Sequence, residues 1–302
     1  MSDIEKIIMF NFGKQNSYRY YNEFKSAIDS KNADKLYNCK LWRYLNALLE
    51  NKQKEIPLAK GKVLYRARKI NDFQIAKTQG VSYKENKFTG FDEINSKEPP
   101  IWLTNEQRCT PMGVSVLYTA EDEYTACAEL NPSHGECISV AKFIVQKDLK
   151  ILDLKTDQRV SLGENVSDLE KAAFAQVITK IMLQFAISVA DQSEYVYSQM
   201  VADLVRKSGY DGLMYMSSKT GGTNIVIFNC HESFVKFIES RIIYSFFNTY
   251  CFYDLNNKEK VVPREKYKIN MSAGLNQQEI EQICKDIIKE FITKKDDENH
   301  GE

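Results

Sequence analysis

Histidine is the scarcest of the residues that commonly carry catalysis, with only three in the chain, at positions 134, 231 and 300. None of them follows an arginine by four to six residues, so the motif of the HEPN ribonucleases is missing. No serine lies in a nucleophile elbow with a histidine at hand to activate it, which disfavours a Ser-His hydrolase. The chain also lacks a Walker loop and a G-x-G-x-x-G motif, so neither an NTPase nor a Rossmann cofactor site is indicated.

The cysteines do not form the pattern of a disulfide or zinc framework. There are seven, an odd number, scattered over positions 39, 109, 127, 137, 230, 251 and 284, and no two are spaced as Cys-x-x-Cys. Residues 134–137 include a histidine and a cysteine that could bind a metal, but nothing nearby completes a set of ligands. We therefore expect reduced thiols, no metal and no bound cofactor in a cytoplasmic protein.

An excess of charge of one sign is also missing, since 41 basic residues balance 41 acidic ones. Without a net field, the chain is not expected to bind nucleic acid or an anionic membrane. The first ten residues include acids and no long apolar run, so they do not predict a signal peptide. The most apolar stretch, residues 172–190, is interrupted by polar side chains and predicts a buried helix rather than a membrane span.

Helical and strand-like segments follow one another irregularly along the chain. Apolar spacing predicts helices over residues 41–49, 195–207 and 276–293, and a capping box at 167–170 predicts the start of the helix that runs to 190. Strands are expected at residues 62–67, 114–118, 137–145, 149–154, 211–216 and 223–228, with edge strands or a hairpin over 233–254. Residues 69–107 are expected to be a long irregular loop, typical of a ligand wall or lid. The order predicts an α+β fold.

Two arginines belong to the first predicted strand and its continuation. Strand side chains alternate between faces, so Arg66 and Arg68 lie on the same side. Arginine binds phosphate through two parallel hydrogen bonds, which suits an anionic ligand. A solvated strand face or a structural ion pair is the simpler explanation of these two residues when they are taken alone.

Residues 108–129 combine three features of a site that holds an anion and stabilises a cation. Arg108 precedes a turn at residues 110–113, Tyr118 ends a predicted strand, and a helix expected to open at Thr119 carries Glu129 on its third turn. Glu129 lies at the border of the apolar stripe of that helix, so a solvent-facing acid is the alternative. The acids at positions 121–123 are expected in the first helical turn, where the helix dipole favours them.

A second element of this kind, a strand, a turn and a strand, covers residues 210–228. Tyr215 and Ser217 lie at the end of the first strand, Gly221 and Gly222 form the turn, and Asn224 belongs to the second strand. Hydroxyls and backbone N–H groups beside a glycine turn can bind a small ligand. Ordinary hairpin chemistry explains the same residues, so this segment alone leaves both interpretations open.

Taken together, these segments resemble the RES domain family, which is named for arginine, glutamate and serine and looks distantly related to the ADP-ribosyltransferase fold. The resemblance lies in the order of the pieces along the chain: residues 64–68, Arg108 with Pro111 and Gly113, residues 116–118, 128–129, 151–154, 198–199 and 209–228. It implies an α+β fold with an ADP-ribosyltransferase-like mixed β core. The implied parts are a helical N-terminal extension at residues 1–58, a RES domain at 59–256, and a C-terminal helix with a charged tail at 257–302.

The resemblance implies an NAD⁺ phosphorylase or NAD⁺ glycohydrolase that acts as a bacterial toxin or defence effector. By position, the implied catalytic residues are Arg66, Tyr118, Glu129 and Ser217, and the implied substrate-binding residues are Arg68, Arg108, Tyr215 and Asn224. Breaking the nicotinamide–ribose bond builds an oxocarbenium-like ribose, which a carboxylate stabilises. Arginines neutralise the diphosphate and an aromatic ring packs on nicotinamide, so neither a metal nor a histidine base is required.

One departure from the family pattern leaves the acceptor of the reaction open. Residues 107–110 read Gln-Arg-Cys-Thr where the family has a Gly-Arg-aromatic-Asn run, so the acceptor is either water or inorganic phosphate. Two alternatives to NAD⁺ degradation also stay open, the transfer of ADP-ribose to a macromolecule and a non-catalytic interaction module. Besides NAD⁺, the resemblance implies an antitoxin or another regulatory protein as a partner, and an oligomer is compatible with the sequence.

Overall fold

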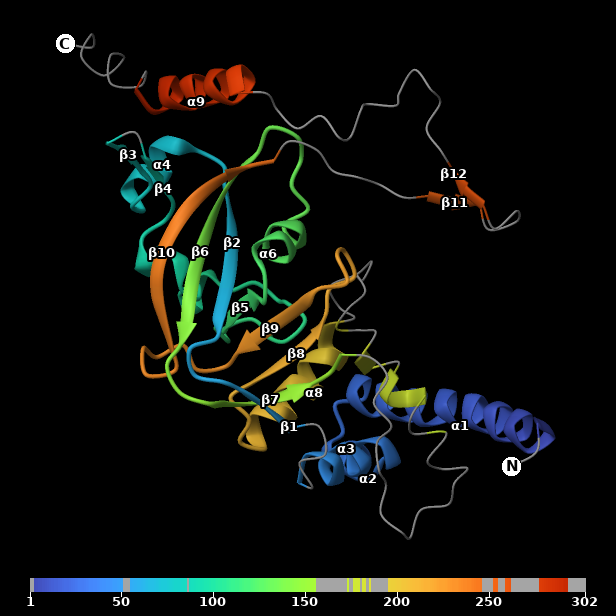
Figure 1. Cartoon of the computed structure of the whole chain (residues 1–302). Helices are drawn as coiled ribbons and strands as arrows, with labels where there is room; N and C mark the ends of the chain where they lie inside the picture. Colours follow the sequence, from blue (N-terminus) through green and yellow to red (C-terminus); the bar gives the residue numbers. More distant parts are fainter. Residues whose placement is uncertain are drawn as a thin grey trace. The chain divides into compact units, whose positions relative to one another are not determined.

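The protein is described from a computed structural model of the whole chain (Figure 1). The structure describes residues 3–50, 55–85, 87–155, 173, 176–179, 181–182, 185, 195–245, 252–254, 259–261 and 277–292. The capping box predicted at residues 167–170 and the charged tail from residue 294 lie outside these residues. Residues 173, 176–179, 181–182 and 185 are helical, in agreement with the buried helix expected there.

Helices and strands are labelled in Figure 1. The helices are α1 (Asp3–Asp29), α2 (Ala33–Asn38), α3 (Lys40–Glu50), α4 (Phe73–Thr78), α5 (Glu93–Ser96), the 3₁₀ helix η1 (Ile101–Leu103), α6 (Glu123–Glu129), α8 (Tyr195–Lys207) and α9 (Gln277–Ile292). The strands are β1 (Glu55–Leu58), β2 (Val63–Ile70), β3 (Ser82–Lys84), β4 (Lys87–Thr89), β5 (Leu117–Ala120), β6 (Cys137–Val145), β7 (Leu149–Asp153), β8 (Gly212–Met216), β9 (Thr223–Ile227), β10 (Val235–Tyr244), β11 (Phe252–Asp254) and β12 (Glu259–Val261). Within the described ranges, no helix is both long enough and apolar enough to span a bilayer.

Eight of the strands form one mixed sheet in the order β1-β7-β8-β9-β5-β2-β6-β10. β7 and β8 run parallel, whereas β8 with β9, β9 with β5, and β1 with β7 run antiparallel. β1 contains Pro57, which is tolerated because β1 is an edge strand. The mixed sheet, the helices before it and the helix α9 after it confirm the predicted α+β fold.

The chain divides into two compact units. The first consists of residues 1–66, 97–129 and 142–238, and the second of residues 67–96, 130–141 and 239–302. β2, β6 and β10 contribute residues to both units. The domain boundaries at residues 58 and 256 that the family resemblance implies remain a prediction.

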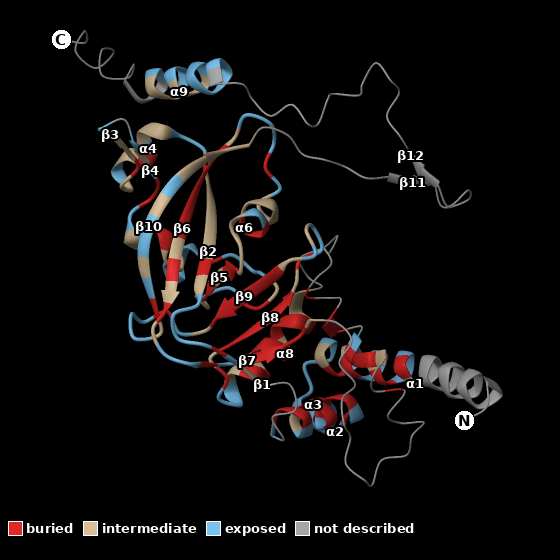
Figure 2. Ribbon diagram, viewed as in Figure 1, coloured by how far each residue is buried: buried red, intermediate tan, exposed pale blue. Residues whose placement is uncertain are grey.

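The core of the first unit is a layer of helices packed on strands. The buried residues of α3 are the stripe predicted from the three- and four-residue spacing, namely Leu41, Trp42, Tyr44, Leu45, Leu48 and Leu49. They belong to one apolar cluster with Phe24 of α1, Val205 of α8, Leu213 of β8 and Val226 of β9 (red in Figure 2). Burial of a large apolar side chain contributes about 1.5–3 kcal/mol, so this cluster holds the helices on the strands.

The second unit has a smaller core, formed by Ile70, Ala76, Val81, Phe91 and Cys137. Ile287 of α9 packs against this core, so the amphipathic helix predicted at residues 276–293 docks on the second unit, to which it belongs. The expectation of an irregular loop over residues 69–107 is wrong, because α4, β3, β4, α5 and η1 lie there. The start signal of α4 is local, because the carboxylate of Asp72 accepts hydrogen bonds from two backbone N–H groups and caps the helix.

The strand and the helix of residues 108–129 begin later than predicted. Thr119 and Ala120 belong to β5, opposite Ile225 and Asn224 of β9, so the expected helix start at Thr119 is wrong. Pairing with a distant strand overrides the local signal, as tertiary context often does. The helix α6 begins only at Glu123, so Glu129 is its last residue instead of lying on a third turn.

Candidate active site

Helix α6 positions the carboxylate of Glu129. The helix is anchored at its start by Asp122, whose Oδ1 accepts a hydrogen bond from the backbone N–H of Thr125 at 2.7 Å. Glu121, which was expected in the first helical turn, lies before the helix and pairs with Lys62, with 3.0 Å between Oε1 and Nζ. Glu129 at the other end of α6 is half-buried, so its carboxylate can bind to protein groups on one side and to a ligand on the other.

Two side chains from the β8–β9 element bind this carboxylate. The Ser217 hydroxyl donates to Oε1 of Glu129 at 2.6 Å, and the Asn224 amide nitrogen donates to the same oxygen at 2.7 Å. Asn224 lies in β9 between Tyr215 of β8 and Ala120 of β5, which are its partners in the two registers. Both donors are almost fully buried, at 1% and 4% exposure, so these charge-assisted bonds are shielded from water. Neither bond uses Oε2, the second oxygen of Glu129.

Arg108 lies on a closed loop in the same unit. The backbones of Gln107 and Thr110 bond to each other in both directions, at 2.9 and 3.1 Å, and the side-chain amide of Gln199 donates to both of their carbonyl groups. The guanidinium of Arg108 donates a hydrogen bond to the carbonyl group of Phe185. Gln199 was noted only as part of the family pattern, and its role in closing the loop depends on a contact across 92 residues that no local signal reveals.

Tyr118 and Tyr215 stand beside this loop as neutral phenols. The hydroxyl of Tyr118 accepts a hydrogen bond from the backbone N–H of Cys109 at 3.1 Å. The ring of Tyr215 is tilted against that of Phe185, with 5.9 Å between centroids. Burial raises the pKa of both tyrosines well above the usual value, so each hydroxyl keeps its proton at neutral pH.

The thiol of Cys109 is not an activated nucleophile. Burial raises the pKa of Cys109 to about 12, although a hydrogen bond with Tyr118 and the charges of Arg108 and Arg206 act in the opposite direction. Nucleophilic cysteines react as thiolates, so this residue has a packing role in the loop. Arg206 of α8 places its guanidinium over the ring of Phe228, 4.9 Å from the centroid, and adds a second positive charge near Cys109.

The two arginines of β2 are placed differently from each other. Tyr65 of β2 pairs with Ala120 of β5. Side chains alternate along a strand, so Arg66 lies on the opposite face of β2 from Tyr65, and its charge acts to lower the pKa of the Cys230 thiol. Arg68 belongs to the second unit, where its guanidinium lies 4.4 Å from the ring centroid of Phe91 and donates to a backbone carbonyl group. The direct bonds that join Glu129, Ser217 and Asn224 therefore include neither arginine, and the implied roles of both arginines remain predictions.

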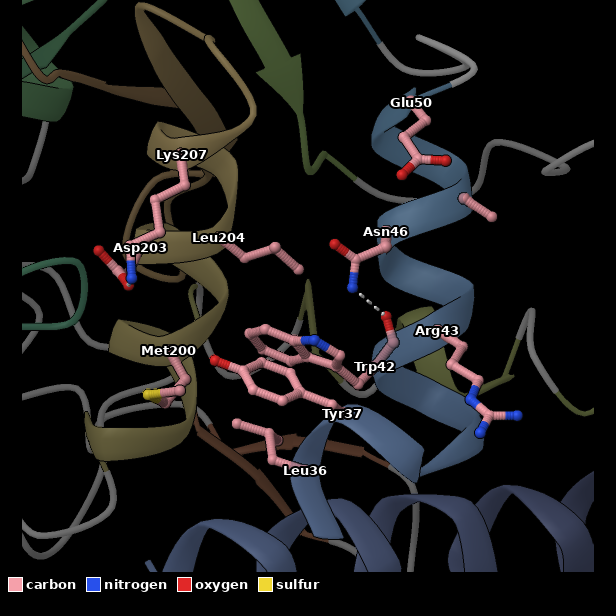
Figure 3. A pocket seen from close by; sticks show the side chains of 11 residues that line it. Leu36, Tyr37, Trp42, Arg43, Asn46, Glu50, Met200, Asp203, Leu204 and Lys207 are labelled. Atoms are coloured by element: carbon pink, nitrogen blue, oxygen red, sulfur yellow. Dashed lines mark hydrogen bonds and ion pairs between the residues drawn. The ribbon is translucent and has the colours of Figure 1, made fainter. Parts of the chain in front are cut away.

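A separate hollow lies between α2, α3 and α8, with a volume of about 540 Å³ (Figure 3). Tyr37 and Trp42 lie beside Leu204 in the view, and charged side chains such as Lys207 surround them. The described residues that line this hollow include none of the predicted site residues. In the described part of the chain, no group of three His, Cys, Asp or Glu side chains could hold a metal ion.

Comparison with known proteins gives a family match and distant structural likenesses. A family model described as the RES domain matches residues 76–247, a span that contains all the predicted site residues except Arg66 and Arg68. No curated protein matches the chain. Among solved structures, the crystal structure of the M. tuberculosis MbcT-MbcA toxin-antitoxin complex aligns with 13% identity and a TM-score of 0.37, over 68% of this chain and 94% of that chain. Because the matched span is more than half of the 302 residues, the chain belongs to the RES domain family.

Proposed function

We propose that the protein cleaves the bond between nicotinamide and ribose in NAD⁺. In this reaction the C–N bond at the anomeric carbon breaks, and nicotinamide leaves as a neutral molecule with the bonding electron pair. The ribose carbon becomes cationic, and a nearby carboxylate stabilises that charge as it develops. An acceptor oxygen then closes the new bond to the same carbon.

The geometry around Glu129 is the observation that carries this proposal. Oε1 of Glu129 is fixed by two donors at 2.6 and 2.7 Å, so the carboxylate is held in one orientation before a substrate arrives. Fixed charge that needs no reorganisation is the most effective form of electrostatic stabilisation. Oε2, which takes part in neither bond, is the oxygen that faces the ribose in this proposal.

The other predicted residues fit the remaining parts of NAD⁺. The guanidinium of Arg108 is directed at a carbonyl oxygen in the structure and provides donors for an anionic diphosphate. The ring of Tyr118 serves as the platform for nicotinamide, and the buried phenol of Tyr215 supplies a proton donor that stays neutral. Arg66 and Arg68 are proposed as further anion ligands on the family resemblance alone.

Water is the favoured acceptor. A phosphate bound by a backbone loop needs free N–H groups. In the loop of Arg108, the N–H groups of Gln107 and Thr110 bond to each other's carbonyl groups, and the N–H of Cys109 bonds to Tyr118. The loop therefore presents few backbone donors to phosphate, so hydrolysis to nicotinamide, ADP-ribose and a proton is favoured over phosphorolysis.

The test is incubation of the purified protein with NAD⁺, with and without inorganic phosphate, and separation of the products. Hydrolysis gives ADP-ribose in both samples, whereas ADP-ribose 1″-phosphate formed only with phosphate identifies a phosphorylase. Glu129→Gln should abolish most of the activity, and Glu106→Gln, a change at an exposed acid near Arg108, serves as the control. Unchanged NAD⁺ refutes the proposal, and labelled NAD⁺ that leaves its label on a macromolecule shows a transferase instead.

We also propose that the protein acts as a bacterial toxin that depletes NAD⁺ and is held in check by an antitoxin. Membership of the RES domain family supports this role. Induced expression of the wild-type chain should lower cellular NAD⁺ and stop growth, whereas expression of Glu129→Gln to the same level should do neither. Equal toxicity of the two chains would point to a non-catalytic interaction module.

A further inference from the structure

Helix α6 and the turn at residues 217–222 are joined at two places. Near the start of the helix, Oγ1 of Thr125 lies 3.0 Å from Oγ1 of Thr220. At the end of the helix, Glu129 accepts the hydrogen bond of Ser217. Thr125 and Glu129 are four residues apart, so they lie one above the other on the same face of the helix. The turn therefore follows this face and is fixed to it at both ends.

The hydrogen bonds at Thr125 and Thr220 can be assigned a direction. The hydroxyl of Thr125 donates its only proton to Oδ2 of Asp122 at 2.7 Å, because a carboxylate oxygen can only accept. In the pair of threonines, Thr220 must therefore be the donor. The oxygen of Thr220 also accepts a hydrogen bond from the backbone N–H of Gly222 at 3.0 Å. Each hydroxyl is satisfied in one arrangement only, which fixes the turn to the helix cap.

The same turn sets the position of Ser217. The backbone N–H of Ser217 donates to the carbonyl group of Gly222 at 2.8 Å, and the N–H of Gly221 donates back to the carbonyl group of Ser217 at 3.0 Å. The N–H of Lys219 donates to the Ser217 hydroxyl oxygen at 3.2 Å, which leaves the hydroxyl proton for Glu129. A displacement of the turn at Thr220 is therefore transmitted to Ser217 through these hydrogen bonds with Lys219, Gly221 and Gly222, the neighbours of Thr220 in the turn.

We infer that Thr220 and Thr125 are positioning residues, which hold the turn on α6 so that Ser217 keeps its hydrogen bond to the Glu129 carboxylate. This inference rests on the proposed function, because it assigns the two threonines a role in the same reaction. Neither threonine touches the substrate, and both act through Ser217. Thr125 is only 1% exposed, so water does not replace the bond when it is lost.

The first test is a kinetic double-mutant cycle. Thr220→Val keeps the shape of the side chain and removes the hydroxyl, and we expect kcat to fall roughly 3- to 10-fold with little change in KM. Thr220→Ser restores the hydroxyl and should restore kcat. In a Ser217→Ala background, Thr220→Val should change kcat by less than about twofold, because the residue on which it acts is gone.

The matched control is Thr78→Val, the same change at an exposed threonine of α4 whose hydroxyl donates to the carbonyl group of Ile75 in the same helix. The inference is overturned if Thr220→Val leaves kcat unchanged, if Thr220→Ser fails to restore it, or if the effects of Thr220→Val and Ser217→Ala multiply. Multiplying effects would mean that Thr220 affects kcat independently of Ser217.

A second readout does not depend on activity. Amide hydrogen exchange over residues 217–222 should be roughly 3- to 10-fold faster in Thr220→Val than in the wild type or in Thr220→Ser. If the wild-type protein does not consume NAD⁺, the proposed function fails, while this exchange experiment still decides whether Thr220 holds the turn. Unchanged exchange in Thr220→Val overturns the inference, whatever the activity.

Discussion

The hydrogen bond from Ser217 to Glu129 gives a prediction whose size follows from the structure. Ser217→Ala removes a donor that lies 2.6 Å from Oε1 of the carboxylate, and the site of the hydroxyl is too buried for water to replace it. Hydrogen bonds to charged groups contribute about 1.5–3 kcal/mol net. If this bond acts mainly in the transition state, at 1.36 kcal/mol for each factor of ten, kcat should fall roughly 10- to 150-fold. The bond from Asn224 remains, so some activity should persist.

The assay is the steady-state rate of nicotinamide release from NAD⁺, measured for wild type, Ser217→Ala and Ser218→Ala. Ser218 is the matched control, because it is the adjacent serine and is exposed to solvent. We expect Ser218→Ala to keep kcat within about twofold, as surface substitutions usually do. Thermal melting of each variant checks that the fold is intact. If Ser217→Ala keeps more than half of the wild-type kcat, or if Ser218→Ala loses as much, the assigned role of the hydrogen bond is wrong.

Three further predictions concern the framework of the site. Gly222→Ala should lower the free energy of unfolding by about 1–3 kcal/mol in urea titrations, because its Cβ would lie 2.2 Å from Oγ1 of Thr125; in a Thr125→Ala background the loss should be smaller. Gln199→Leu should cost about 1–3 kcal/mol in the same assay, because two hydrogen bonds that close the loop are lost, at about 0.5–1.5 kcal/mol each, and equal stability would refute the loop-closing role. Burial acts to raise the pKa of Glu121, but hydrogen bonds with Lys62 and with Thr223 of β9 outweigh burial and lower the pKa. The stabilisation from Glu121 is therefore present above the ordinary pKa of 4.5 and lost as the pH falls below it, so urea titrations of Glu121→Gln should differ from wild type near neutral pH and converge in acid.

Local patterns predicted the elements whose stability is local. The three- and four-residue spacing of apolar residues located α3 and α9, and burial of the apolar face of α3 bears out the reasoning. The strands β6, β7, β8 and β9 were also expected within a few residues of their ends. In contrast, Thr119 was assigned to a helix and lies in β5, because its partner Ile225 is more than one hundred residues away.

The sequence by itself determined the α+β class and the family, and it selected Glu129, Ser217 and Asn224 as candidate site residues. These follow from residue types and their order, which need no knowledge of distant contacts. Only the tertiary structure decided that Ser217 and Asn224 both donate to one oxygen of Glu129, and that Thr220 ties the serine turn to the same helix. The physical reason is that these bonds join residues 88 to 95 positions apart, so their geometry is set by the pairing of β8, β9 and β5 and by no local signal.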